Sequence, residues 1–390
     1  MTSGEAPVPS FGNGTDVRVT IIGSGSLGLV LAAALAGAGH KVTLLARPTS
    51  AAALRDQGTI EISGKLALSV PAGPPPARPG RVAVTHHPGD LPGANAVLFT
   101  SKGHDLPESI EAVADAWPVQ HRPGAFVAGL QHGIVKDELL AAAFGGHAVV
   151  GAATVLGAQR LSPGTATVTG LGTTFFGEFD APSSARAELV TAAFLAAGLP
   201  SVVVGEIKSL LWTKFCNAIG IFGVSALTRL PSVEIFARPS LAFAYRSLLE
   251  EAAAVAAAEG VRAGDFPDLP IRTYLEPPPE EAVAEMGRRV KPAPGQPPGF
   301  SSIAQDLAAG RRTEVEETFG DFLRRAHAHG LTAPRAELVY RILSGLGPSP
   351  EDDDPAGLDP AGPGTAGPGT GDPGASGPGA AGQPGTMARG

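Results

Sequence analysis

The sequence is poor in cysteine and in positive charge. Cys216 is the only cysteine among its 390 residues, so an internal disulfide is excluded. A lone thiol is typical of a reducing compartment, and we expect a cytoplasmic protein. Only 29 Lys and Arg stand against 37 Asp and Glu, which gives a net charge of −8. Because nucleic acids bind basic surfaces, we expect no nucleic-acid partner.

Targeting and membrane signals are also missing. The N-terminal stretch MTSGEAPVPSFGNGTD has neither a basic start nor an apolar run, so we expect no signal peptide. Residues 139–158 contain no Asp, Glu, Lys or Arg, and they approach the ~20 residues that a membrane span requires. However, Gly145 and Gly146 interrupt this stretch, and β-branched residues follow. We therefore predict a buried helix followed by a strand, and no membrane partner.

The predicted elements change in kind once along the chain. As far as about Val204, short apolar strands alternate with Ala-rich helices, and continuous runs such as AVLFT are typical of a covered parallel sheet. Strands are predicted at 17–23, 41–47, 94–101, 124–131, 147–155, 166–170 and 173–178. From about Gly205 the strands stop, and helices are predicted at 206–229, 241–259, 279–289, 301–309 and 314–329, with Gly260 and Gly330 as stop signals.

The fold class that follows is α/β: a Rossmann-type dinucleotide-binding domain and then an all-α domain. We place the first at 16–205 and the second, which would carry substrate and catalysis, at 206–346. A leader at 1–15 and a Gly- and Pro-rich tail at 347–390 are predicted to be disordered. Two further Pro-rich stretches, 71–80 and 291–300, are predicted to be solvent loops.

A glycine motif follows the first predicted strand. In VTIIGSGSLG (19–28), Gly23, Gly25 and Gly28 have the G-x-G-x-x-G spacing, with a strand before and a helix after. The first glycine permits a tight turn, the second lets a pyrophosphate approach, and the third allows helix and strand to pack. We predict a dinucleotide site here, rather than an ordinary Gly-rich turn, with these contact residues: Gly23, Ser24, Gly25, Ser26, Leu27 and Gly28.

The end of the second strand indicates which dinucleotide is bound. NAD-binding folds usually place an acidic residue there for the ribose 2′-OH, whereas this chain has Arg47. A guanidinium suits a 2′-phosphate, so we predict NADP(H). The alternative is a solvated surface arginine, which would leave the missing carboxylate unexplained.

Candidate reacting residues follow the glycine motif. Lys102 comes directly after a strand, at the sheet edge where ligands bind. Lys214 lies in the apolar stretch LLWTKFCNAIGIF (210–222), where burial would lower its pKa. Ser302 and Asp306 are one helical turn apart, and Thr313 with Glu316 has capping-box spacing. By spacing alone, this last region reads as two capped surface helices.

Five motifs occur in an order that resembles the 2-dehydropantoate 2-reductases (ketopantoate reductases). They are IIGSGSLG, FTSKGHDL, GLQHG, LLWTKFCNA and SSIAQDLAAGRRTEVEE, and the resemblance covers roughly residues 17 to 345. It implies reduction of a 2-keto acid to the 2-hydroxy acid with NADPH, by default 2-dehydropantoate to pantoate in pantothenate biosynthesis. A small 2-keto acid is then the partner, no metal is required, and the protein is a monomer or homodimer.

The resemblance also implies roles for individual residues. Lys214 matches the general acid and Glu314 the carboxylate that engages this lysine and the reacting oxygen. Ser302 matches the residue that binds the substrate carboxylate, and Lys102 lies near nicotinamide and substrate. We also place Gln131 and His132 at the cofactor, and Asn217, Phe222 and Asp306 at the substrate.

Several asparagines of the family pattern are replaced in this chain. His132, Ala218, Phe222 and Gly299 stand at these positions, although Asn217 lies beside one of them. Each lost hydrogen bond would cost ~1 kcal/mol or more, and Phe222 would make the pocket more apolar. A diverged reductase of a less polar 2-keto acid or an imine is therefore the alternative. A non-catalytic NADP-binding sensor is a third, less favoured because it would need neither Lys214 nor Glu314.

Overall fold

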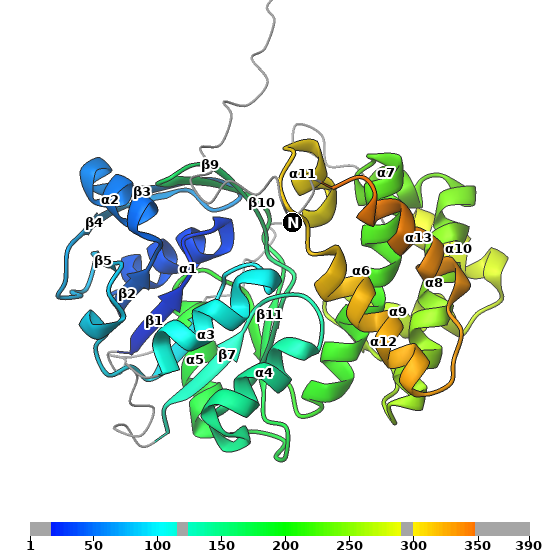
Figure 1. Ribbon diagram of the computed structural model, residues 1–390, viewed down its shortest axis with the longest axis horizontal. Helices are drawn as coiled ribbons and strands as arrows, with labels where there is room; N and C mark the ends of the chain where they lie inside the picture. Colours follow the sequence, from blue (N-terminus) through cyan, green and yellow to red (C-terminus); the bar gives the residue numbers. More distant parts are fainter. Residues whose placement is uncertain (1–16, 115–123, 290–298, 348–390) are drawn as a thin grey trace, which may run out of the picture. The chain divides into compact units, whose positions relative to one another are not determined.

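The computed structural model describes residues 17–114, 124–289 and 299–347. The leader predicted at 1–15 and nearly all of the predicted tail lie outside these residues, as does most of the loop predicted at 291–300. Figure 1 shows strands in the blue-to-green part of the chain and helices α6 to α13 in the green-to-orange part. The predicted α/β class with a helical C-terminal part is confirmed.

A nine-stranded sheet carries the first part of the chain. Its order is β7-β6-β1-β2-β5-β4-β3-β10-β9. The parallel half consists of β7 (Phe126–Gly129), β6 (Ala96–Phe99), β1 (Arg18–Ile22), β2 (Lys41–Leu45) and β5 (Val82–Thr85). The other half consists of β4 (Leu68–Gly73), β3 (Thr59–Gly64), β10 (Thr165–Gly170) and β9 (Gly157–Ser162). Here β3–β4 and β9–β10 are antiparallel, so the sheet is mixed.

Four of these strands were not predicted: β3, β4, β5 and β9. β3 and β9 alternate between covered and exposed residues, and β4 contains Pro71 and ends in Gly73, so none of the three has a continuous apolar run. The loop predicted at 71–80 is wrong at its start, because β4 extends to Gly73. A second sheet has the order β12-β11-β8, with β12 (Ser201–Val203), β11 (Thr174–Gly177) and β8 (Gly151–Thr154).

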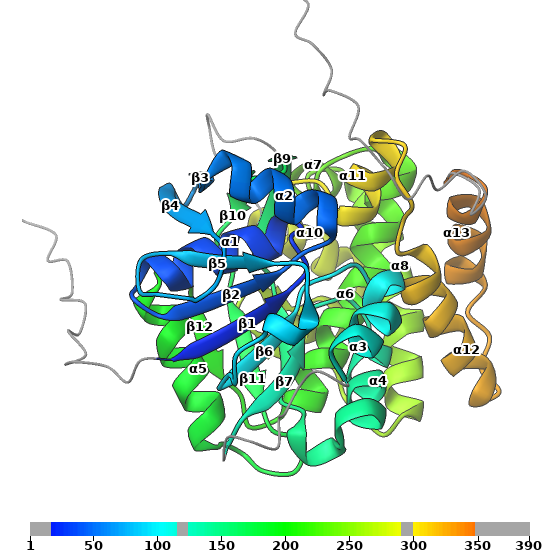
Figure 2. The ribbon, with the colours of Figure 1, turned by 60° about the vertical axis from the view of Figure 1, so that its left-hand side comes forward.

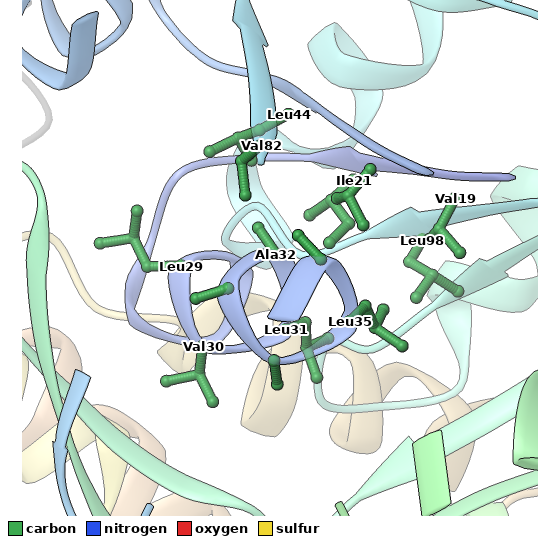
Figure 3. Close-up of a cluster of buried hydrophobic side chains, with 14 of the residues drawn as sticks. Val19, Ile21, Leu29, Val30, Leu31, Ala32, Leu35, Leu44, Val82 and Leu98 are labelled. Atoms are coloured by element: carbon green, nitrogen blue, oxygen red, sulfur yellow. The ribbon is translucent and has the colours of Figure 1, made fainter. Parts of the chain in front are cut away.

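Helix α1 (Ser26–Gly37) is the centre of the first core. Figure 3 shows Leu29, Val30, Leu31, Ala32 and Leu35 of α1 in one cluster with Val19 and Ile21 of β1 and with Leu44, Val82 and Leu98 from the neighbouring strands. The helix also contacts β9 and β10, so apolar side chains surround it on every side. Figure 2 shows α1 lying along β1 and β2. The other helices of this part are α2 (Pro48–Gln57), α3 (Leu106–Ala114), α4 (Val135–Phe144) and α5 (Ala185–Ala196).

Helix α6 (Ile207–Thr228) organises the second part. It packs on α8 (Pro239–Ala258), where Gly220 lets the Tyr245 ring approach: a Cβ there would lie 2.7 Å from that ring. The other elements are α7 (Ser232–Phe236), α9 (Ile271–Leu275), α10 (Pro279–Arg289), α11 (Ser302–Ala308), η5 (Glu316–Gly320), α12 (Asp321–Ala328) and α13 (Pro334–Ser344). α6 also packs on β8, and the division into two domains at 205 stays a prediction.

Most helices predicted in this part are confirmed, and Gly260 and Gly330 follow α8 and α12 with positive φ. Three short or terminal helices were not predicted (α7, α9 and α13), and a small hairpin, β13 (Asp265–Phe266) with β14 (Leu269–Pro270), contradicts the expectation that strands stop at 205. The capping box is also wrong. Glu316 bonds Tyr340 instead, and the segment begins as the π-helical turn η5.

In the part of the chain that the structure describes, one helix, α6, is long and apolar enough to cross a membrane, but 78% of its apolar window is buried inside the protein. This burial is typical of the core helix of a globular protein. The stretch 139–158 is interrupted as predicted: α4 ends at Phe144, and β8 begins at Gly151.

Candidate active site

The glycine turn joins β1 to α1. Gly23 has φ 108°, and its N–H donates to the Leu45 carbonyl (2.9 Å). A Cβ at Gly23 would lie 2.7 Å from the Ser101 nitrogen, and one at Gly28 only 2.0 Å from the Gly23 carbonyl oxygen. At Gly25, by contrast, the nearest atom would be the Thr100 carbonyl oxygen at 3.9 Å. Gly23 and Gly28 therefore serve packing, whereas Gly25 presents an open backbone face.

This turn has the chemistry of an anion site. Gly25 is the N-cap of α1, no acidic side chain lies in the first helical turn, and no side chain caps it. Ser24 is buried, and Ser26 and Leu27 form the first turn. The N–H groups of a helix N-terminus attract a phosphate, and here they coincide with the open face of Gly25. The residues present thus fit a dinucleotide pyrophosphate.

Arg47 follows β2 and is the N-cap residue of α2. Its guanidinium pairs with Asp105 (2.9 Å), which lies in the turn η2 (Gly103–Asp105) after β6. Because β2 and β6 are the two neighbours of β1, this ion pair links the strands on either side of the glycine turn. The Arg47 side chain is 66% exposed, so the pair is available for exchange with another anion.

Lys102 is held by two carboxylates from the second part of the chain. Its Nζ lies 2.7 Å from Asp306 and 3.2 Å from Glu314. Glu314 also accepts the Gly103 N–H (2.7 Å), and Asp306 pairs with Arg311 (3.2 Å). Burial opposes the charge of Lys102, but the two carboxylates outweigh it and raise its pKa. Likewise burial opposes the charge of Glu314, but Lys102 and the Gly103 N–H help to lower its pKa.

Lys214 is buried on α6, with 9% of its surface exposed. Burial lowers its pKa to about 7, and Lys136 adds to this, whereas Glu314 and Asp137 act in the opposite direction. The direction is the one expected from the sequence. Within the described part of the chain, Lys214 has no hydrogen bond or ion pair. An ammonium of this kind can donate a proton near neutral pH.

Gln131 and His132 lie in the turn between β7 and α4. The Gln131 amide donates to the Ser101 carbonyl (3.1 Å), which ties this turn to the end of β6. His132 stacks edge-to-face on Phe222, with ring centroids 4.6 Å apart. Burial, and next the Lys214 charge, lower the pKa of His132 to about 3, so the ring is neutral. His132 and Phe222, which stand where the sequence comparison above expects asparagines, thus contact each other.

Ser302, Asp306 and Asn217 were also predicted to bind the substrate, and each has its own set of neighbours. Ser302, in the first turn of α11, has a buried Oγ with no hydrogen-bond partner among the described residues. Asp306 faces Lys102 and Arg311. Asn217 accepts a hydrogen bond from the Tyr245 hydroxyl (2.9 Å) on α8. Its amide therefore serves the contact between α6 and α8, and its assignment to substrate stays a prediction.

Several of the predicted site residues have a buried polar atom without a hydrogen-bond partner among the described residues. Within the described ranges, the buried side-chain atoms without a partner include Gln131 Oε1, His132 Nδ1, Ser302 Oγ, Asp137 Oδ1 and Glu317 Oε2. A buried polar atom is costly unless something hydrogen-bonds it. Glu317 packs against the turns at Gly103 and Gly133, and Gln131 and His132 directly precede Gly133. Polar atoms without partners at these turns fit a polar ligand. No group of metal-ligating side chains occurs in these same ranges.

Sequence reasoning missed one pair of residues here. Lys136 and Asp137 are both buried, at 1% and 6% exposure, and they pair with each other at 2.6 Å. Lys136 acts electrostatically on both Lys214 and His132. Their position shortly after GLQHG, separated from it by Ile134 and Val135, was the available signal, but a charged Lys-Asp pair at a helix start is typical of a solvent-exposed site.

Comparison with known families agrees with this geometry. Residues 19–181 match the family described as ketopantoate reductase PanE/ApbA, and residues 206–347 match its C-terminal domain. Among curated proteins, the 2-dehydropantoate 2-reductase of Halobacterium salinarum is 29% identical over 331 residues, covering 85% of this chain and 97% of that protein. The enzyme of the same name from Archaeoglobus fulgidus is 26% identical, covering 84% and 97%.

Solved structures lead to the same family. A PanE/ApbA family ketopantoate reductase from Ralstonia eutropha superimposes with a TM-score of 0.65 at 26% identity, covering 84% of this chain and 98% of that one. D-mandelate dehydrogenase with NADH and anilino(oxo)acetate shares the fold, with a TM-score of 0.68 at 16% identity and coverage of 84% and 98%.

Proposed function

The chain belongs to the ketopantoate reductase family, and from this premise we propose that it reduces a 2-keto acid to the 2-hydroxy acid with NADPH, taking 2-dehydropantoate as its default substrate. As a member of this family it is an oxidoreductase. We further propose that it works in the cytoplasm, as a monomer or homodimer, without nucleic acid or membrane.

The observation that carries the proposal is the buried ammonium of Lys214. A bound nicotinamide supplies the hydride for the carbonyl carbon. Lys214 then donates its proton to the carbonyl oxygen, so the ketone becomes an alcohol and the lysine is left neutral. With its pKa near 7, the lysine loses this proton more readily than an exposed lysine would. Its positive charge also stabilises the alkoxide that develops as the carbon is reduced.

The other groups would bind the substrate and orient it for reduction. Ser302 brings a buried hydroxyl without a partner among the described residues, which suits the substrate carboxylate. Lys102 offers a cation, and Asp306 and Glu314 fix its position from the helical part. The carboxylates therefore tie the placement of Lys102 to the packing of the helical part beside the strand end.

For the cofactor we propose NADP(H). Arg47 is the cation at the end of β2, where a 2′-phosphate is recognised, and no carboxylate for a 2′-OH stands at that strand end. The guanidinium would exchange its pairing with Asp105 for the phosphate. An Arg47→Ala variant should lose affinity for NADPH by about tenfold while NADH binding changes little. Equal losses for both cofactors would contradict this choice.

A second candidate is a less polar 2-keto acid. His132 and Phe222 contact each other where the family pattern has asparagines, and His132 is neutral. Phe222 and a neutral imidazole favour a branched or aromatic side chain over the hydroxyl of ketopantoate. Steady-state NADPH oxidation with ketopantoate, 2-ketoisovalerate and phenylglyoxylate distinguishes the two. A higher kcat/KM for ketopantoate than for both others would reject the second candidate.

The general-acid assignment has its own test. Lys214→Met should abolish reduction and leave NADPH affinity close to that of the wild type, because the substitution keeps the apolar stem of the side chain. Lys208→Met, on an exposed position of the same helix, is the matched control and should keep full activity. Turnover by Lys214→Met within tenfold of the wild type would show that another group donates the proton.

A further inference from the structure

An acidic residue holds the arginine that a cofactor phosphate would need. Asp105 is the last residue of the turn η2, and its Oδ1 lies 2.9 Å from an Nη of Arg47. Arg47 follows β2, whereas η2 follows β6, so the two side chains approach each other from opposite sides of β1. The contact therefore lies where these strand ends flank the glycine turn. The reaction proposed above gives Asp105 no role.

Arg47 is the main ionic partner of this carboxylate among the described residues. His104 Nε2 lies farther from the same oxygen, at 3.8 Å. Lys102 is close in the chain, but its Nζ pairs with two carboxylates of the helical part instead. The charge of Asp105 is thus directed at Arg47 rather than at the groups that would surround the keto acid.

The Arg47–Asp105 pair is exposed enough to be exchanged. The Arg47 side chain is 66% exposed, and that of Asp105 is 27% exposed. Water and salt weaken a pair of this kind, so an incoming anion can displace the carboxylate. Residues 46–50 contain no charged side chain other than Arg47. A 2′-phosphate bound at this strand end therefore needs the same guanidinium that Asp105 holds.

We propose that Asp105 limits the selectivity of the site for NADPH over NADH, because its carboxylate competes with the 2′-phosphate for Arg47. The inference rests on the proposed role of Arg47 in binding NADP(H). NADPH must break the ion pair before its phosphate can bind, and the phosphate then lies near a second negative charge. NADH has a hydroxyl at this position and binds with the ion pair intact. The cost therefore falls on NADPH alone.

The test measures the Kd of NADPH and of NADH by fluorescence titration of the full chain. Asp105→Asn keeps the shape of the side chain and removes its charge. It should tighten NADPH binding by about fivefold, which an exposed ion pair can withhold, and leave the Kd of NADH within about twofold. Asp105→Glu keeps the charge and should bind both cofactors as the wild type does. Glu108→Gln removes an exposed charge of α3 and should change neither Kd.

A double variant separates competition for Arg47 from simple repulsion. In an Arg47→Ala background there is no guanidinium to compete for, so adding Asp105→Asn should tighten NADPH binding by less than about twofold. An equal gain in both backgrounds would show that the carboxylate only repels the phosphate, and it would overturn the inference. A merely structural role of Asp105 would lower the Tm of Asp105→Asn and weaken both cofactors alike, which would also overturn it.

Failure of this inference differs from failure of the proposed cofactor. If Arg47→Ala weakens NADPH binding by about tenfold while Asp105→Asn changes nothing, NADP(H) stands as the cofactor and the role of Asp105 is overturned. If Arg47→Ala leaves the affinity for NADPH unchanged, Arg47 does not bind the 2′-phosphate. The choice of NADP(H) and the inference about Asp105 then fall together.

Discussion

Alanine substitutions at two glycines of the turn separate cofactor binding from packing. Gly25 has φ −68° and ψ −178°, a conformation open to any residue, and a new Cβ would contact only the Thr100 carbonyl oxygen at 3.9 Å. The free energy of unfolding of Gly25→Ala should therefore change by less than about 1 kcal/mol. The same methyl group would stand where the backbone must approach a pyrophosphate.

Gly28→Ala meets a different obstacle. Its Cβ would lie 2.0 Å from the Gly23 carbonyl oxygen and 2.7 Å from Thr100 Oγ1, so α1 must move away from β1. Overpacking of this kind costs about 1–3 kcal/mol. In a protein of this size we expect the Tm to fall by about 2–4 °C for each kcal/mol.

Thermal melts with and without NADPH, together with a fluorescence titration of NADPH, measure both effects. Gly25→Ala should melt like the wild type without ligand and should lose the stabilisation by NADPH. If the methyl group removes about 2 kcal/mol of pyrophosphate binding, the Kd rises about 30-fold. Gly28→Ala should melt earlier in both conditions. Wild-type affinity in Gly25→Ala would refute the argument, because the pyrophosphate would then not lie against this turn.

Three further outcomes are expected. Asn217→Ala leaves the buried Tyr245 hydroxyl without its acceptor. The free energy of unfolding should therefore fall by about 1–3 kcal/mol, and the KM for the keto acid should not change. A higher KM at unchanged stability would instead show that Asn217 binds the substrate. Burial raises the pKa of Cys216 to about 12, so iodoacetamide should modify it only in denaturant, and rapid modification of native protein would contradict this. Finally, wild-type single-turnover reduction should fall as the pH rises through about 7, where Lys214 loses its proton, and a flat profile from about pH 6 to 9 would exclude Lys214 as the acid.

Local patterns made the glycine turn and most helices predictable. The turn lies within six consecutive residues, and its φ and packing demands appear directly as Gly23 and Gly28. α10 has the predicted bounds, 279–289, because Pro at its start and the Pro-rich sequence after it are local signals. The strand β3 was missed because its exposed positions carry polar residues such as Glu61, which pattern reasoning assigns to loops.

Contacts across the chain could not be read in this way. Lys102 meets Asp306 and Glu314 over separations of 204 and 212 residues. Only packing of the helical part against the sheet brings them together. The same holds for Lys136: its charge looks solvated in the sequence, and only the space beside Gly129 shows that it is buried.

The sequence by itself determined the fold class, the glycine turn and the identity of the chemical groups, because each depends on neighbouring residues or on spacing along one element. Only the tertiary structure decided their burial and their partners. It turned Asn217 toward Tyr245, joined His132 to Phe222 and buried Lys136 against Asp137. The physical reason is that burial and Coulomb interactions depend on distances in space, which residue spacing does not specify.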